Sequence, residues 1–222
     1  LQKYVSVYVF QRGLITLNQP GDLDQGQRLI SQAASLSSQD IYYRTLSEIG
    51  LTQINQLLAT SKLTKEELRT RFLAQTDLAI KNAMKATTLD SQNYLNWLSL
   101  GRVYETLVPL GVDKAYEQGQ AAFNQAKQLK PTDPSILLNY FARLEIGNKN
   151  LAKARGYVKD SLVAKNDYIP AISLLSQIDA QEGNLDVAAR RLEEFLGTYP
   201  QANDAGLYFQ LGWLKYQRQN YS

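Results

Sequence analysis

A spacing of 34 positions between two similar segments constrains this chain more than any other feature of its sequence. One segment runs from Asn150 to Leu162, and the second runs from Asn184, 34 positions after Asn150, to Leu196. Both segments place alanine and larger apolar residues at helical spacing. Fixed periods of roughly 20 to 50 residues are typical of arrays in which each unit stacks on the next. We therefore expect a stack of similar helix pairs.

A second pattern, further upstream, indicates the same array. The segment Trp97–Tyr104 reads WLSLGRVY and fits the pattern W-x2-L-G-x2-Y. After it, small and large residues follow one another at Gly119, Phe123 and Ala126, and Pro131 comes next. Because proline cannot continue a helix, Pro131 is expected to close the second helix of this unit.

These two patterns together resemble the tetratricopeptide repeat, whose units are about 34 residues long. The resemblance covers nearly the whole chain and implies an all-α fold, a right-handed superhelical solenoid of antiparallel helix pairs. It also implies a single repeat domain over residues 1–222. We expect units at residues 1–38, 39–91, 92–133, 134–167 and 168–202, and a partial unit at 203–222.

The residue types at the repeated positions have a physical explanation. Two antiparallel helices that cross closely need a small residue, such as Gly101 or Ala126, where their backbones approach. Large residues such as Trp97 and Phe123 are expected to fill the space between neighbouring units. Trp97 is therefore predicted to be a core residue, and Gly101→Leu is expected to destabilise the fold by a few kcal/mol.

The helix ends are also marked in the sequence. The pairs Gly147-Asn148 and Gly183-Asn184 are predicted to cap helices and to form the turns inside two units. The segment Val108–Val112 lengthens one turn, and Thr60–Glu67 lengthens another. Within the second of these insertions, Thr64 and Glu67 have the spacing of a capping box, which predicts a helix start.

Residues 2–18 carry two conflicting signals. Val5, Val7 and Val9 alternate with other residues and are β-branched, which is typical of a strand. The repeat array, however, needs a first helix to pair with the helix predicted for residues 22–36. We therefore predict a helix for residues 2–18.

The composition excludes several kinds of chemistry. The chain has no cysteine and no histidine, so thiolate or imidazole metal ligands and His-based acid–base catalysis are excluded. We expect no catalytic residue, no metal site and no cofactor, and hence no enzyme in this chain. The net charge of +3, with both signs mixed along the sequence, does not indicate nucleic acid as a partner.

The resemblance further implies a concave groove, lined by the first helix of each unit, that holds a peptide or protein partner. The chain is then a scaffold for protein–protein interaction. From the spacing, first-helix residues that do not face the core are expected to point into this groove. They are Arg44, Glu48, Arg102, Glu105, Asn139, Glu145, Gln177, Gln181, Trp213 and Tyr216. Leu98 and Arg102 do not reproduce the Lys/Asn/Arg clamp with which some repeats of this family grip a terminal carboxylate.

A narrower resemblance gives an alternative function. The segments Asp40–Ser47 and Asp90–Trp97 are similar to the repeat region that follows the membrane helices of bacterial O-antigen ligase/polymerase-like proteins. This resemblance implies an extracytoplasmic accessory domain of a membrane-bound glycan ligase or polymerase, attached to the membrane through segments that precede Leu1. Without it, a cytoplasmic location is expected.

The last predicted helix, from Gly206 to Gln219, lacks a partner helix in the sequence. An open end of a repeat array exposes apolar surface unless something caps it. We therefore expect Leu207, Leu211 and Leu214 to be covered by another chain or to cause self-association. The exposure of Trp213 is expected to follow from the same open end.

Overall fold

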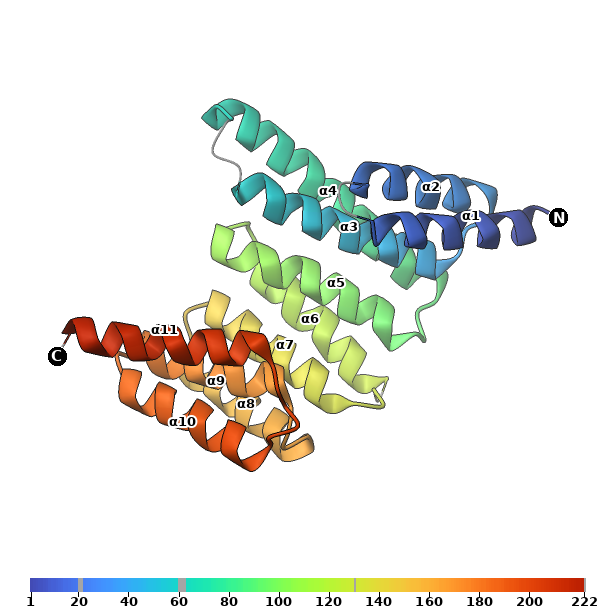
Figure 1. Cartoon of the computed structure of the whole chain (residues 1–222). Helices are drawn as coiled ribbons and strands as arrows, with labels where there is room; N and C mark the ends of the chain where they lie inside the picture. Colours follow the sequence, from blue (N-terminus) through green and yellow to red (C-terminus); the bar gives the residue numbers. More distant parts are fainter. Residues whose placement is uncertain (20–21, 60–62, 130, 222) are drawn as a thin grey trace. The chain divides into compact units, whose positions relative to one another are not determined.

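The computed structural model describes residues 1–19, 22–59, 63–129 and 131–221, which form eleven α-helices, one short 3-10 helix and no strand (Figure 1). The fold is all-α and built of antiparallel helix pairs, as predicted. Residues 60–62, inside the predicted insertion, lie outside the described residues, as does Ser222. The helices are α1 (Gln2–Leu17), α2 (Leu23–Leu36), α3 (Asp40–Ala59), α4 (Lys65–Leu89), α5 (Tyr94–Leu107), η1 (Val108–Leu110), α6 (Ala115–Gln128), α7 (Pro134–Gly147), α8 (Leu151–Ala164), α9 (Ile169–Gln181), α10 (Leu185–Thr198) and α11 (Ala205–Tyr221).

The contacts divide the chain into two compact units, Leu1–Lys130 and Pro131–Ser222. In the first unit, α1 pairs with α2, α3 with α4 and α5 with α6. In the second unit, α7 pairs with α8 and α9 with α10, and α11 packs on both α9 and α10. Inside each unit, neighbouring first helices also contact each other: α3 contacts α5, and α9 contacts both α7 and α11.

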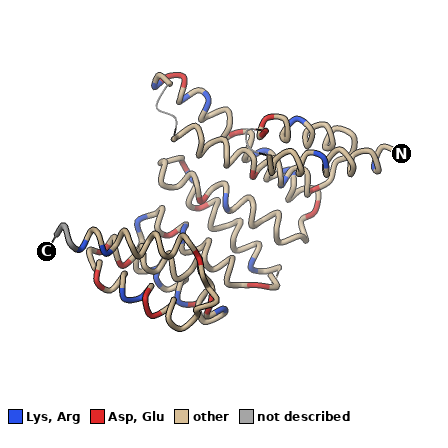
Figure 2. The backbone as a smooth tube through the Cα atoms, in the orientation of Figure 1, with Lys and Arg blue, Asp and Glu red and all other residues tan. Residues whose placement is uncertain are grey.

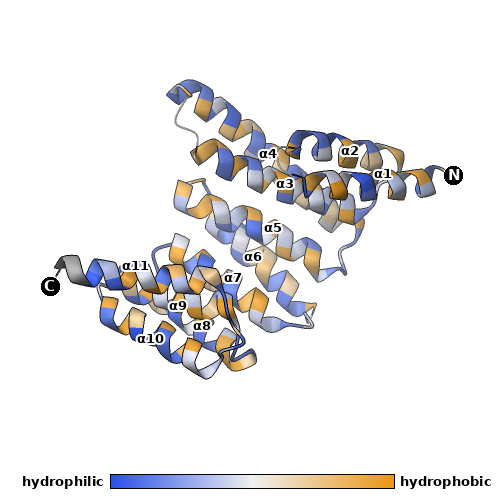
Figure 3. Cartoon of the chain, in the orientation of Figure 1, coloured by the Kyte–Doolittle hydropathy of each residue, from blue (hydrophilic) through white to orange (hydrophobic). Residues whose placement is uncertain are grey.

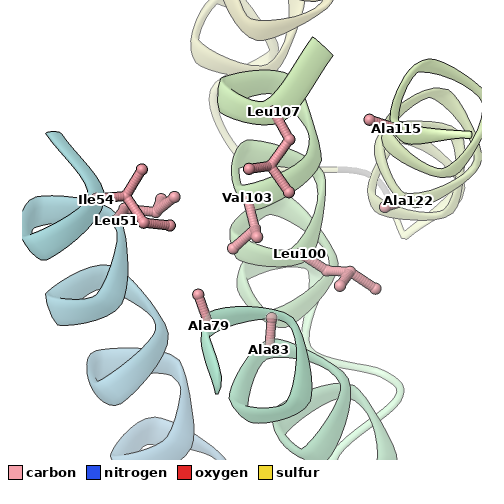
Figure 4. Packing of buried hydrophobic residues seen from close by; sticks show 9 residues of the cluster. All are labelled: Leu51, Ile54, Ala79, Ala83, Leu100, Val103, Leu107, Ala115 and Ala122. Carbon is pink, nitrogen blue, oxygen red and sulfur yellow. The ribbon is translucent and has the colours of Figure 1, made fainter. Parts of the chain in front are cut away.

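Large residues on first helices pack against alanines on second helices. Figure 4 shows Ile54 and Val103 directed toward Ala79 of α4, with Leu107 one turn further along α5. Figure 3 shows apolar and polar residues interleaved along every helix, as expected when each helix buries one stripe. Trp97 is partly buried and packs against this cluster, and its indole Nε1 donates to the Ser91 carbonyl at 2.9 Å. The prediction that it is a core residue is therefore confirmed only in part.

The predicted close crossing at Gly101 is also confirmed. A Cβ atom added to Gly101 would lie 2.2 Å from Cε1 of Phe123, whose side chain is completely buried. A similar approach occurs in α3, where a Cβ on Gly50 would lie 2.9 Å from that of Ala79. Glycine is needed at these positions because the facing helix leaves no room for a side chain.

The conflict over residues 2–18 is resolved in favour of a helix. In α1 the residues that face the interior are Ser6, Phe10 and Gly13, which have helical spacing, whereas Val5 and Val7 are exposed.

The capping box is present at the start of α4. Thr64 Oγ1 accepts from the Glu67 amide at 3.2 Å, and the Thr64 amide donates to Glu67 Oε2 at 3.0 Å.

The turns inside the second unit are Schellman motifs at the two predicted places, but the left-handed residue of the first turn is not a glycine. Gly183 has a φ of 81° and ends α9 in the left-handed conformation. In the equivalent turn after α7 this position belongs to Lys149, with a φ of 61°, and Gly147 remains in the helix. In the turn after α7, the Asn150 amide donates to the Glu145 carbonyl at 2.8 Å, and the turn after α9 has the equivalent bond.

The end of the array is closed more fully than the sequence suggested. Leu207 and Leu214 are only 1% exposed, because α11 packs on both helices of the preceding pair. The expectation that these leucines need another chain is therefore wrong for both of them, and Leu211 is half-buried in the same cluster. Ion pairs reinforce the packing, with Lys215 Nζ 2.6 Å from Glu193 Oε1 and Arg218 paired with Asp186.

We predict that Gly101→Ala lowers the free energy of unfolding by about 1 to 3 kcal/mol, because a methyl group would overlap the buried Phe123 ring. The matched control is Gly156→Ala in α8, where nothing lies within 4 Å of the added atom. This control should gain about 0.5 to 1 kcal/mol from helix propensity. Urea unfolding followed by circular dichroism measures both, and equal effects of the two changes would contradict the close crossing.

We also predict that Lys149→Gly stabilises the protein by about 1 kcal/mol, because a left-handed conformation is unfavourable for a side chain with a Cβ atom. Gly183→Ala, at the equivalent turn, should destabilise by a similar amount. Thermal unfolding of both variants tests the pair. Loss of stability in Lys149→Gly would show that this turn is not left-handed.

Candidate partner-binding surface

Six of the predicted groove residues gather at two places on the first helices. In the first unit, Arg44, Glu48 and Arg102 line one cavity between α3 and α5. In the second unit, the cavity between α9 and α11 is lined by three more. They are Gln177, Gln181 and Trp213. We call these places the α3–α5 patch and the α9–α11 cleft.

The α3–α5 patch is small and its charges are paired. Its volume is about 270 Å³, and Thr45, Leu95, Leu98 and Ser99 complete its lining. Arg102 Nη1 lies 2.8 Å from Glu48 Oε2, and the Ser99 hydroxyl donates to Glu48 Oε1 at 3.0 Å. A charged guest would have to compete with these existing partners.

Arg44 is positioned by a buried asparagine that the sequence analysis did not identify. Asn96 accepts from Arg44 Nη1 at 2.7 Å, and its Nδ2 donates to Asp40 Oδ2 and to the Asp90 carbonyl, each at 2.9 Å. Burial opposes ionisation of Asp40, but the hydrogen bonds from Asn96 and Asn93 outweigh it and hold the pKa of Asp40 below its ordinary value. The network fixes the start of α5 to α3.

The α9–α11 cleft is larger and mostly apolar. Its volume is about 590 Å³, within the range of cavities that hold ligands. Phe209 is 79% exposed and Trp213 is 47% exposed on the α11 side, while Pro170 lies on the α9 side. The lining residues are Ile169, Pro170, Ser173, Gln177, Ala180, Gln181, Asp204, Gly206, Leu207, Phe209, Gln210, Trp213 and Leu214.

The polar groups of the α9–α11 cleft are amides and a hydroxyl. The Ser173 hydroxyl donates to Gln210 Oε1 at 2.8 Å, and Gln210 Nε2 donates to the Ser173 carbonyl at 3.1 Å. This pair of bonds joins α9 to α11 and fixes the Gln210 side chain. Asp204, the one charged residue in the described lining, accepts from the Leu207 amide at 2.9 Å, near the start of α11.

Three predicted groove residues lie elsewhere. Glu105, Asn139 and Glu145 are buried, so the prediction that they face a groove is wrong. Glu145 points toward the second helix of its own pair, where its carboxylate lies 2.6 Å from Lys153 Nζ of α8. Neighbouring residues on a helix differ by about 100° in direction, so a face counted from an approximate helix start is easily assigned to the wrong side.

The remaining predicted residue, Tyr216, is exposed but does not line the α9–α11 cleft. Phe209, Ser173 and Gln210 do line it, although the sequence analysis did not select them. A usable signal was present, because Leu211-Gly212 repeats the Leu100-Gly101 pair of the W-x2-L-G motif. That alignment places Phe209 and Trp213 where Leu98 and Arg102 stand in α5, and both of these α5 residues line the α3–α5 patch.

The described residues contain no group of three or more side chains of the metal-ligating types that could hold a metal ion. The same part of the chain has no helix that is both long and apolar enough to cross a membrane. Figure 2 shows Lys and Arg interspersed with Asp and Glu in both units, without a large area of one sign. Surface charge therefore does not define the candidate site.

The fold is that of solved tetratricopeptide-repeat proteins. TTC0263, a thermophilic TPR protein of Thermus thermophilus, is 17% identical, with a TM-score of 0.70 over 94% of this chain and 98% of that chain. PilF of Pseudomonas aeruginosa is 18% identical, with a TM-score of 0.63 over 98% and 87% of the two chains. A chain of the APC/C hetero-tetramer Cut9–Hcn1 is 15% identical, with a TM-score of 0.65 over 96% of this chain and 37% of that one. The sequence matches no family model and no curated protein.

We predict that Asn96→Ala lowers the free energy of unfolding by about 2 to 3 kcal/mol at neutral pH, because it removes the donor to the buried Ala86 carbonyl and to two partly buried acceptors. A lowered pKa in the folded state means that Asp40 contributes stability above its unfolded pKa, and that this contribution is lost as pH falls through the folded pKa. The difference in the free energy of unfolding between the parent and Asn96→Ala should therefore become smaller at acidic pH. Chemical unfolding over a pH series measures it, and a difference that grows in acid would refute the network.

Proposed function

We propose that this chain is a scaffold for protein–protein interaction and that it holds an extended segment of a partner protein in the α9–α11 cleft. The observation that carries the proposal is the exposure of Phe209 and Trp213 beside an apolar cavity of about 590 Å³. Large aromatic side chains are the residues that most often dominate the energy of protein interfaces. A cavity beside them gives a partner side chain a place to be buried.

The geometry of the first helices supports a segment rather than a small molecule. The α9–α11 cleft lies between two neighbouring first helices, and one end of α9 contributes Pro170 while the other contributes Gln181. These two residues are eleven positions apart on a helix that rises about 1.5 Å per residue, so the cleft is about 16 Å long. An extended peptide covers this length with about five residues.

The structural comparisons support the proposal only by analogy of fold. The Cut9–Hcn1 structure is a hetero-tetramer, so a chain of this fold takes part in a protein complex there. The structures named above offer no support for the O-antigen ligase resemblance, and the proposal does not extend to it. Self-association through α11 is a competing use of this helix, because Tyr208 and Tyr216 are exposed on it outside the cleft.

The test is a selection of random peptides displayed on phage against the immobilised chain, followed by measurement of each selected peptide against variants. We predict that Trp213→Ala weakens binding of the selected peptides by about tenfold or more, because truncation removes the largest aromatic side chain of the lining. The matched control is Glu194→Ala, an exposed change on α10 that lies outside the cleft and should leave affinity unchanged.

Circular dichroism melting should show that Trp213→Ala folds like the parent, because the side chain is about half exposed. Peptides that bind the parent and Trp213→Ala equally well would place binding outside the α9–α11 cleft. A selection that yields no peptide above background would count against the scaffold function itself.

A further inference from the structure

The geometry points to an occupant of defined chemistry: an uncharged peptide segment that inserts a bulky apolar side chain between Trp213 and α9, with its backbone along the glutamine side chains. This inference rests on the proposed function and adds the class of segment that the α9–α11 cleft accepts. It is carried by the charges, the hydrogen-bonding groups and the dimensions of the described lining.

The described lining offers no positive charge to an anionic anchor and a single negative charge to a cationic one. Asp204 is the one charged residue among the described lining residues, and its carboxylate already accepts from the Leu207 amide. The two cationic residues nearest on α11 are held away from the cleft, because Lys215 pairs with Glu193 and Arg218 pairs with Asp186 on α10. A charged guest side chain would be desolvated in this mostly apolar cleft, an anion without any counter-charge and a cation with Asp204 alone, which is unfavourable.

The hydrogen-bonding groups suit a peptide backbone. The glutamine side chains that line the cleft each carry one acceptor and two donors, and a peptide unit presents one donor and one acceptor. Gln210 is already oriented by its two bonds to Ser173, and Gln177 Nε2 lies 3.4 Å from the Ser173 hydroxyl. Oriented amides lower the entropy lost on binding, because fewer rotamers have to be fixed.

The dimensions and the walls suit one large apolar side chain. Ile169, Pro170 and Leu214 lie on the same cavity as the Trp213 ring. A volume of about 590 Å³ accommodates a leucine- or phenylalanine-sized side chain together with its flanking backbone. The α3–α5 patch differs in kind, because it is about half as large and contains the Arg102–Glu48 ion pair. An apolar anchor therefore selects the α9–α11 cleft over that patch.

The chain provides its own probe for this inference. It has two tryptophans, of which Trp97 is packed in the core of the first unit and Trp213 lies on the cleft. The Trp97→Phe variant leaves Trp213 as the single emitting indole, and the reverse variant, Trp213→Phe, reports on Trp97 alone. Desolvation of an indole shifts its emission to shorter wavelength, so binding at the cleft and binding elsewhere are distinguishable.

The experiment titrates Trp97→Phe with blocked peptides of about ten residues, which are long enough to cross the cleft. The peptides share a glycine–serine frame and differ in three adjacent central residues, which are leucine, phenylalanine, lysine or glutamate, at concentrations up to the millimolar range. We expect leucine and phenylalanine peptides to blue-shift Trp213 and to bind about tenfold or more tightly than the lysine and glutamate peptides. Trp213→Phe should show no shift with any of them.

The possible outcomes separate this inference from the proposed function. The inference falls, while the scaffold function stands, if the charged peptides shift the emission of Trp213 as strongly as the apolar ones. The same holds if peptides from the phage selection bind through charged residues and still need Trp213. If no apolar peptide shifts Trp213 although selected peptides bind elsewhere on the chain, the inference and the proposed location both fall. If no peptide binds at all, the proposed function falls with them.

Two other occupants are tested with the same signal. A gluco-oligosaccharide that shifts Trp213 when the apolar peptides do not would assign the cleft to glycan and overturn the inference. A blue shift that grows with protein concentration alone, together with a dimer in light scattering, would assign it to a second copy and overturn the inference likewise. A monomer whose Trp213 responds to apolar peptides only supports it.

Discussion

The close crossing of paired helices is the constraint on which the rest of this structure depends. At Gly101 the backbone of α5 comes so near α6 that the ring of Phe123 occupies the space of a side chain. The same approach joins α3 to α4 at Gly50 and Ala79. Small residues at these points let large apolar residues from neighbouring helices form the core clusters of each unit, which an isolated helix pair could not bury alone.

This pairing determines which faces of the first helices remain available. The first helices α3, α5 and α9 each pack on their own second helix and, inside their unit, on the preceding pair, so a strip of each is left exposed. In the first unit that strip carries Arg44 and Arg102, with their partners Asn96 and Glu48. In the second unit it carries Trp213 and neutral side chains. The same fold therefore presents two surfaces of different chemistry, because the strip is free of packing constraints.

Much of the fold was predictable from the sequence, because it follows from local rules. The W-x2-L-G motif and the capping box at Thr64 each specify the structure of a few neighbouring residues, and the 34-residue spacing indicates that the same helix pair recurs. The candidate site was predictable only in part. Trp213 and Gln177 were identified, but Glu145 was assigned to the wrong face, since an error of one residue turns a helix face by about 100°. The Asn96 network joins α3 to α5, which are distant in sequence, and residue spacing does not encode it. The left-handed Lys149 could have been assigned from the repeat, because it stands 34 positions before Gly183.

The repeat motif places Trp97 against the core of the first unit, where it is partly buried, whereas Trp213 of α11 is 47% exposed beside the α9–α11 cleft. Acrylamide quenching of the two single-tryptophan variants measures this difference in the free protein. We predict that Trp213 is quenched more efficiently than Trp97, which packs against the core and donates to the Ser91 carbonyl. Equal quenching of the two indoles, or stronger quenching of Trp97, would contradict it.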